Sequence, residues 1–161
     1  MLIRPVQPSD HESLWSLLEP VIRAGETYTL DRDLSRQAAL AYWCGPDKST
    51  FVALLDDKII GTYYLKQNQE GGGAHVCNCG YVTDLIARGR GVARQMCHHS
   101  KAEALKQGFL AMQFNFVVAN NVGAIALWQK LGFNIVGTLP RAFNHPQDGF
   151  VDAHVMYQWL E

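Results

Sequence analysis

The feature that most constrains this chain is a change of pattern along residues 75–107. The segment HVCNCGYVTDLI, residues 75–86, is rich in β-branched and apolar residues and predicts a strand. A turn of glycine and arginine, ARGRGVAR, comes next, and residues 91–107 then have the pattern of a helix. The first N–H groups of such a helix have no partners within it and carry partial positive charge. This order of elements therefore predicts a binding site for a phosphate or pyrophosphate.

Two common phosphate-binding folds fit the turn poorly. A P-loop requires Gly-Lys-Ser/Thr after its glycines, and this turn has RGRGVAR instead, which excludes an ordinary NTPase. A dinucleotide-binding fold uses G-x-G-x-x-G near the start of a βαβ unit. Gly89 and Gly91 fit the first half of that motif, but Arg94 stands at the third glycine. An antiparallel hairpin is also predicted before the turn, so this fold is only an alternative.

Length and charge indicate one domain without a broad basic surface for nucleic acid or an acidic membrane. The 161 residues fit a single domain, residues 1–161, and are few for two. Fourteen Lys and Arg against fifteen Asp and Glu leave a net charge of -1, so neither nucleic acid nor an acidic membrane is an expected partner. No apolar run approaches the roughly 20 residues that span a bilayer, and MLIRPVQPSD lacks the apolar stretch of a signal peptide. We expect a cytoplasmic protein.

The four cysteines are expected to be buried thiols in a reducing compartment: Cys44, Cys77, Cys79 and Cys97. The alternative is a zinc site at CNC, because the first and last residues of this triplet share one face of a strand. His98 and His99 follow in the next helix. The spacing matches no known zinc motif, and no metal is expected.

The first third of the chain predicts a strand and two helices. A short strand in LIRPVQPSD precedes a helix over residues 11–25, which Ser9 or Asp10 could cap. The apolar stripe of this helix is expected to comprise Leu14, Leu17, Leu18 and Val21. Residues 25–33 are predicted to form a loop, and residues 34–45 a second helix that ends in glycine. The two helices and their loop are expected to cover one side of a sheet.

The rest of the chain completes an α/β fold with a mixed sheet. Residues 50–55 and 59–67 predict an antiparallel hairpin, and the glycine-rich residues 68–75 a loop. After the strand and helix of residues 75–107, a strand is predicted at 109–120 and a helix at 122–132. Residues 133–139 and 150–160 are expected to be the closing strands, joined by a loop.

Two motifs, one in the turn of residues 88–93 and one after the next strand, resemble those of the GNAT superfamily of acetyltransferases. Arg88, Gly91 and Ala93 match R/Q-x-x-G-x-G/A. About 30 residues later, NNVGAIALWQKLGF resembles the N-x-x-A-x-x-L-(Y)-x-K-x-GF segment of the superfamily. The resemblance covers nearly the whole chain. Within the superfamily it is similar to small bacterial enzymes that are distantly similar to fungal acetyltransferases for proline analogues.

The resemblance implies a fold and a ligand. The fold is a mixed, mostly antiparallel sheet, splayed at the cofactor site and flanked by about four helices. The ligand is acetyl-CoA, with its pyrophosphate on the backbone N–H groups of the turn and its pantetheine arm between residues 83–86 and 116–120. The cofactor residues implied in this way are Thr83, Leu85, Ile86, Arg88, Gly89, Arg90, Gly91, Val92, Ala93, Arg94, Asn121 and Trp128.

One position departs from the family pattern. The superfamily usually has a tyrosine that supports the departing thiolate, and the matching residue here is Trp128. An indole N–H can donate a hydrogen bond but is no proton source. A thiol has a pKa of about 8.5, so a hydrogen bond from Asn121 or Trp128 could suffice. The alternatives are a core position for Trp128 and a helix cap for Asn121.

The sequence constrains the general base and the acceptor pocket less than it constrains the cofactor site. Candidate bases are Glu26, in the loop expected to line the acceptor pocket, and Asp84, at the end of the strand beside the cofactor. Deprotonation through water, with no single base, is the alternative. Other candidates for contact with the acceptor are Tyr28, Asn78, Asn115 and His145.

The resulting prediction is an acetyl-CoA-dependent N-acetyltransferase that acts on a small amine, such as an amino acid or a toxic analogue, by direct attack in a ternary complex. Two alternatives stay open: a non-catalytic acyl-CoA-binding or regulatory domain, which the missing tyrosine would explain, and an acetyltransferase for protein N-termini or lysines. The oligomeric state stays open, with a homodimer as one alternative.

Overall fold

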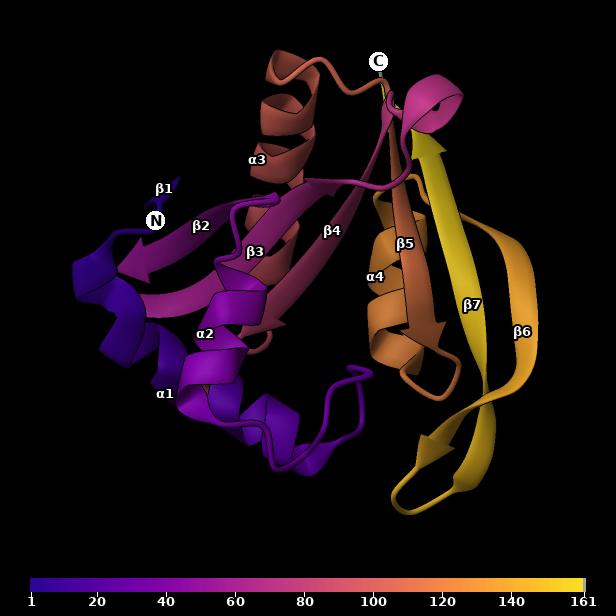
Figure 1. Cartoon of the computed structure of the whole chain (residues 1–161), viewed down its shortest axis with the longest axis horizontal. Helices are drawn as coiled ribbons and strands as arrows, with labels where there is room; N and C mark the ends of the chain where they lie inside the picture. The colour runs from indigo at the N-terminus through magenta and orange to yellow at the C-terminus, as the bar shows by residue number, and fades with distance from the viewer. Residues whose placement is uncertain (161) are drawn as a thin grey trace.

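The computed structural model of this chain, described for residues 1–160, is a seven-stranded sheet with helices on both faces (Figure 1). The strand order is β1-β2-β3-β4-β5-β7-β6, and only the β4–β5 pair is parallel. The strands are β1 (Leu2–Pro5), β2 (Lys48–Leu55), β3 (Lys58–Gln67), β4 (Val76–Thr83), β5 (Ala111–Val118), β6 (Asn134–His145) and β7 (Gly149–Trp159). The helices are α1 (His11–Ala24), α2 (Arg36–Trp43), α3 (Val92–Lys106) and α4 (Val122–Lys130). This confirms the expected fold class.

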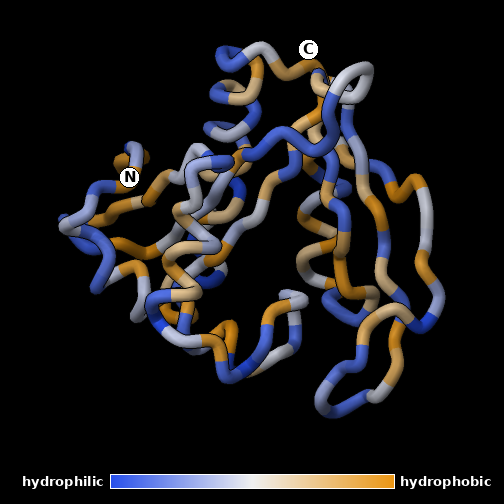
Figure 2. The backbone as a smooth tube through the Cα atoms, viewed as in Figure 1, coloured by the Kyte–Doolittle hydropathy of each residue, from blue (hydrophilic) through white to orange (hydrophobic). Residues whose placement is uncertain are grey.

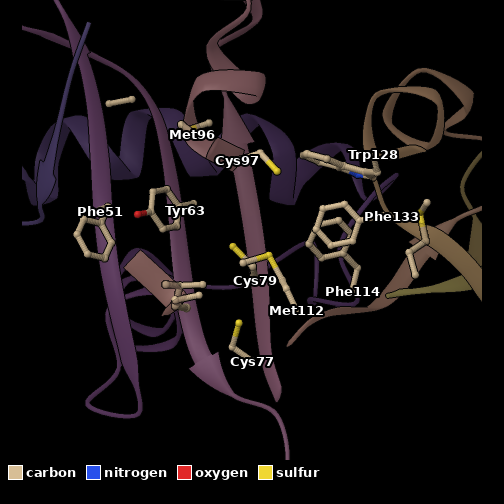
Figure 3. Packing of buried hydrophobic residues seen from close by; sticks show 14 of the residues in the cluster. Phe51, Tyr63, Cys77, Cys79, Met96, Cys97, Met112, Phe114, Trp128 and Phe133 are labelled. Atoms are coloured by element: carbon tan, nitrogen blue, oxygen red, sulfur yellow. The ribbon is translucent and has the colours of Figure 1, made fainter. Parts of the chain in front are cut away.

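Two apolar layers hold the helices to the sheet. On one face, α1 and α2 cover β3 and β4 with buried residues that include Leu14, Leu18 and Trp43. On the other face, α3 and α4 pack on β3, β4 and β5, and Figure 3 shows Met96, Cys97 and Trp128 of these helices pointing at the sheet. Figure 2 shows hydrophobic segments along the central strands and a hydrophilic tip on the β6–β7 hairpin.

The sheet opens between β4 and β5. These strands pair only at Val76/Ala111, Cys77/Met112 and Asn78/Gln113, and their ribbons then diverge toward their carboxyl ends (Figure 1). β4 stays paired with β3 on its other side as far as Thr83. The backbone groups of β4 that face β5 after Asn78 therefore have no strand partner, which confirms the predicted splay.

The start of α1 differs from the prediction. Asp10 makes no side-chain cap on α1; its carboxylate accepts two hydrogen bonds from Arg4, at 2.7 and 2.8 Å, and one from the backbone N–H of Gln7 at 2.7 Å. It therefore stabilises the single 3₁₀ turn Pro8–Asp10 that leads into the helix. The buried stripe of α1 includes Ile22, whereas Val21 is only half-buried.

The Arg4–Asp10 pair predicts a pH-dependent stability. The Arg4 guanidinium lowers the pKa of the Asp10 carboxyl. A lowered pKa adds stability that is present above the unfolded value of about 3.9 and is lost as the pH falls through the folded value. We expect Arg4→Met to cost about 1–3 kcal/mol of unfolding free energy at pH 7, and the difference from the unsubstituted chain to shrink below about pH 4. Urea titrations at both pH values measure this; a difference that persists in acid would contradict it.

Two segments near the ends of strands were predicted inaccurately. The strand predicted at 75–86 ends at Thr83, because Asp84 starts a 3₁₀ turn, Leu85–Ala87, by accepting a hydrogen bond from the N–H of Ile86 at 3.0 Å. The loop predicted after residue 139 is instead the second half of β6. Its register shifts between Leu139 and Phe143, where Arg141 has a left-handed φ of 53°. Such a bulge, next to Pro140, hides the period of a strand in the sequence.

The cysteine side chains pack as small apolar groups. All four are free; Cys77, Cys79 and Cys97 are buried, and Cys44 is half-buried. Burial raises the pKa of Cys77 to about 12, so its thiol stays protonated near neutral pH. Within residues 1–160 no group of three or more metal-ligating side chains is present. None of the helices in that range is long and apolar enough to cross a membrane.

Candidate functional site

Two glycines shape the turn before α3. Gly89 and Gly91 have left-handed φ angles of 77° and 76°, which favour glycine over any residue with a Cβ. A Cβ at either position would meet no atom within 4 Å. These glycines therefore face open space, and the backbone there can be approached closely from outside.

The turn exposes a set of free N–H donors. The N–H groups of Arg88 and Arg90 bond inside the turn, to Leu85 and Ala87, each at 3.3 Å. The first helical bond of α3 is made by Gln95, to the carbonyl of Gly91 at 3.0 Å. Five other N–H groups have no acceptor within residues 1–160: those of Gly89, Gly91, Val92, Ala93 and Arg94. These five N–H groups are the backbone donors of the turn that remain available to an anion, and we call them the cradle.

The arginines of the turn add positive charge that the described chain does not neutralise. Arg88, Arg90 and Arg94 are exposed. None of them forms an ion pair or a side-chain hydrogen bond with any residue in 1–160. Free N–H groups, a helix dipole and unpaired guanidinium groups at one place suit a ligand with several negative charges.

The turn lies beside the open end of the sheet. Thr83 pairs with Gly61 of β3, and its β5 side is free. Leu85 and Ile86 follow with 56% and 78% of their surfaces exposed, which is unusual for apolar side chains on consecutive residues. On the other side of the gap β5 ends at Val118, and the turn after it is closed by a hydrogen bond from the N–H of Asn121 to the Val118 carbonyl. An anionic ligand on the turn could extend a chain into this gap.

Trp128 lies in α4, and Asn121 is the N-cap residue just before that helix. Trp128 is only 8% exposed, and its ring packs on those of Tyr81 and Phe114 at centroid distances of 5.0 and 5.1 Å (Figure 3). Its indole N–H makes no hydrogen bond within residues 1–160. The Asn121 side chain accepts a hydrogen bond from the N–H of Ala124 at 3.4 Å and so caps α4. Both residues have structural roles, and their predicted contacts with a leaving group stay predictions.

A cavity of about 580 Å³ lies between α1, the β2–β3 turn and the segment that follows β4; we call it the α1 pocket. Glu26 and Asp84, the two predicted bases, both line it. Its lining residues are Ser13, Ser16, Leu17, Pro20, Val21, Ala24, Glu26, Thr27, Asp57, Lys58, Ile59, Thr83, Asp84, Leu85 and Arg88. The structure thus brings the predicted bases together beside the turn.

The other four predicted acceptor residues do not line the α1 pocket. The Tyr28 hydroxyl donates to the carbonyl of Tyr81 at 2.8 Å, and burial raises its pKa. The Asn78 amide donates to the carbonyl of Gln113 at 3.0 Å and so joins β4 to β5. The remaining two are also engaged: Asn115 donates to the side chain of Asn68, and His145 accepts from the N–H groups of Gln147 and Asp148.

Sequence reasoning missed several residues of the α1 pocket. The sequence pattern identifies Ser13 and Ser16 only as positions in a helix, and Lys58 only as part of a hairpin. The only available signal was the Asp-Asp-Lys turn itself, which places a charged side chain at the start of β3. No local pattern indicates that this turn and α1 share a cavity, because that depends on how the helix packs on the sheet.

Comparisons with known proteins agree with this geometry. Residues 12–133 match the model of the acetyltransferase (GNAT) family. N-acetyltransferase aca1 of Schizosaccharomyces pombe is 28% identical in an alignment of 155 positions that covers 86% of this chain and 74% of that protein. The solved structure of a GCN5-related N-acetyltransferase from Kribbella flavida is 38% identical, with a TM-score of 0.92 and coverage of 99% of this chain and 97% of that one. A phosphinothricin acetyltransferase from Sinorhizobium meliloti, solved in complex with AcCoA, shares the fold at 19% identity, with a TM-score of 0.86 and coverage of 99% and 88%.

Proposed function

The chain belongs to the GNAT family of acetyltransferases, and from this membership we propose that it transfers the acetyl group of acetyl-CoA to the amine of a small molecule, such as an amino acid or an analogue of one. Transfer proceeds by direct attack of the amine on the thioester while both substrates are bound. The AcCoA bound to the Sinorhizobium meliloti enzyme supports acetyl-CoA as the co-substrate.

The observation that carries the proposal is the turn of residues 88–94 at the mouth of the β4–β5 gap. Coenzyme A combines a pyrophosphate with a long arm that has amide groups. The five free N–H donors and three unpaired arginines fit the pyrophosphate. The backbone of β4 that faces the gap, up to Thr83, can pair with the amides of the arm. Such a ligand would cover the exposed side chains of Leu85 and Ile86.

The side chains around the gap have distinct tasks in this proposal. Attack by the amine forms the C–N bond and breaks the C–S bond, and the ammonium proton leaves through Glu26 or Asp84, directly or by way of water. The departing thiolate receives a hydrogen bond from the Asn121 amide or the Trp128 indole. Because a thiol has a pKa of about 8.5, this support does not have to include full protonation.

We expect coenzyme A to raise the melting temperature of the protein, because a ligand that binds only the native state adds stability. The gain is roughly 2.7 kcal/mol at a ligand concentration of 100 Kd. Thiol release from acetyl-CoA should then depend on an added amine from a panel of amines and amino acids. No shift at millimolar CoA would contradict the proposed cradle. A shift without thiol release for any amine would favour a non-catalytic acyl-CoA-binding domain.

A further inference from the structure

The α1 pocket adjoins the β4–β5 gap along residues 83–88, which the pocket shares with the proposed cofactor site. Its walls come from α1 with the residues just after it, the β2–β3 turn and residues 83–88; none comes from β5 or α4. Thr83 and Asp84, and after them Leu85 and Arg88, belong both to this pocket and to the segment that borders the gap. A molecule in the pocket can therefore reach a cofactor arm in the gap at the end of β4.

One wall of the pocket is apolar, formed by Leu17, Pro20, Val21, Ala24 and Ile59. Around it lie polar groups that the fold leaves unused. Pro20 lies inside α1 and has no N–H, so the carbonyl of Ser16 loses its usual helical donor. Glu26 forms no ion pair within residues 1–160. Only one oxygen of Asp84, Oδ1, accepts a backbone hydrogen bond, from Ile86. These groups offer the pocket hydrogen-bond acceptors for an ammonium group.

Two cations line the pocket, Lys58 and Arg88, and Arg88 is assigned above to the pyrophosphate, which leaves Lys58 for the acceptor. Lys58 is the first residue of β3 and follows Asp56 and Asp57, which have left-handed φ angles of 48° and 61°. Gly61, three residues further along β3, pairs with Thr83, so the Lys58 backbone lies about 10 Å along the strand from the end of β4. Lys58 forms no ion pair within residues 1–160, not even with Asp57 beside it.

We propose that the α1 pocket binds the acceptor and that Lys58 selects acceptors that carry a carboxylate as well as an amine. This inference rests on the proposed acetyl transfer. The amine lies against Glu26 and Asp84, next to the gap, and the aliphatic body covers the apolar wall of α1. The carboxylate pairs with the Lys58 ammonium. Lys58 therefore determines specificity and takes no part in the chemical step.

The test compares each amino acid with the amine left when its carboxyl group is removed: leucine with isoamylamine, and 4-aminobutyrate with propylamine. We expect a lower KM for at least one amino acid than for its matched amine. Lys58→Met should raise the KM of that amino acid on the order of tenfold and leave the KM of the amine and both kcat values unchanged. Lys58→Arg should restore the preference. Lys130→Met, which removes an exposed positive charge at the end of α4, is the control and should change neither KM.

The outcomes separate this inference from the proposed function. Equal KM values within both pairs, or an equal effect of Lys58→Met on amino acid and amine, would overturn the role of Lys58 while leaving acetyl transfer intact. Binding of CoA without acetylation of any of the four compounds or the wider amine panel would overturn the proposed function itself. Unchanged melting temperature and CoA affinity of Lys58→Met would show that its effect is confined to the acceptor.

Discussion

Gly91→Val is expected to fold and to lose coenzyme A binding. A valine at φ 76° strains the turn, and its branched Cβ would project into the open space that the free N–H groups border. Several charge-assisted hydrogen bonds to the pyrophosphate would be lost together. We expect Kd for CoA to rise by at least about a hundredfold, since each such bond contributes roughly 1.5–3 kcal/mol. Isothermal titration calorimetry measures this.

Gly108→Val is the matched control for this substitution. Gly108 follows α3 at its other end, has a left-handed φ of 90°, and would also place a Cβ in open space. Both variants should lose a similar stability, about 1–2 kcal/mol for a side chain in left-handed backbone. Only Gly91→Val should lose affinity for CoA. An equal loss of affinity in both variants would mean that strain, and not the cradle, explains the result.

Substitutions of Trp128 are expected to separate packing from catalysis. Trp128→Ala removes a ring that is 8% exposed and packs on Tyr81, Phe114 and Phe133, so we expect a loss of about 3–5 kcal/mol of unfolding free energy. Trp128→Phe keeps an aromatic ring and removes the indole N–H. It should lower kcat by less than about tenfold, because a thiolate leaves readily and Asn121 can also donate a hydrogen bond.

The Phe variant is the informative one. If the indole N–H is the main support for the leaving thiolate, its loss should resemble removal of an oxyanion-type donor and lower kcat on the order of a hundredfold or more. Such a decrease, with CoA affinity and melting temperature unchanged, would show that the leaving group depends on Trp128. Urea unfolding of both variants gives the packing contribution separately.

Local patterns predicted the fold well where they were strong. The β2–β3 hairpin, the amphipathic α1 and the strand, turn and helix around Gly91 all have short-range signals that tertiary contacts reinforce. Two of the errors lie where a tertiary contact replaced a local rule. Asp10 looked like a helix cap, but its carboxylate pairs with Arg4 of β1. The strand character of residues 140–145 depends on pairing with β7 across a bulge, which no local period shows.

The residues of the site differ in how far the sequence predicts them, because some depend on local structure and others on tertiary contacts. Backbone donors at Gly91 and its neighbours follow from the turn alone, so the sequence located them. Which N–H groups stay free depends on bonds inside the turn, such as Arg90 to Ala87, and required the structure. The partners of Tyr28, Asn78, Asn115 and His145 are distant or conformation-dependent and could not be foreseen. The proposed role of Lys58 follows from the packing of α1 on the sheet, which forms the α1 pocket.

The most direct measurement of the central claim is a titration of the ¹⁵N-labelled protein with coenzyme A, followed by backbone amide chemical shifts. The account predicts that the largest changes fall on the five free donors, Gly89, Gly91, Val92, Ala93 and Arg94, with smaller changes on Arg88 and Arg90, whose N–H groups already have partners. Saturation with CoA that leaves these five amides unchanged, while amides elsewhere in the chain shift, would contradict it.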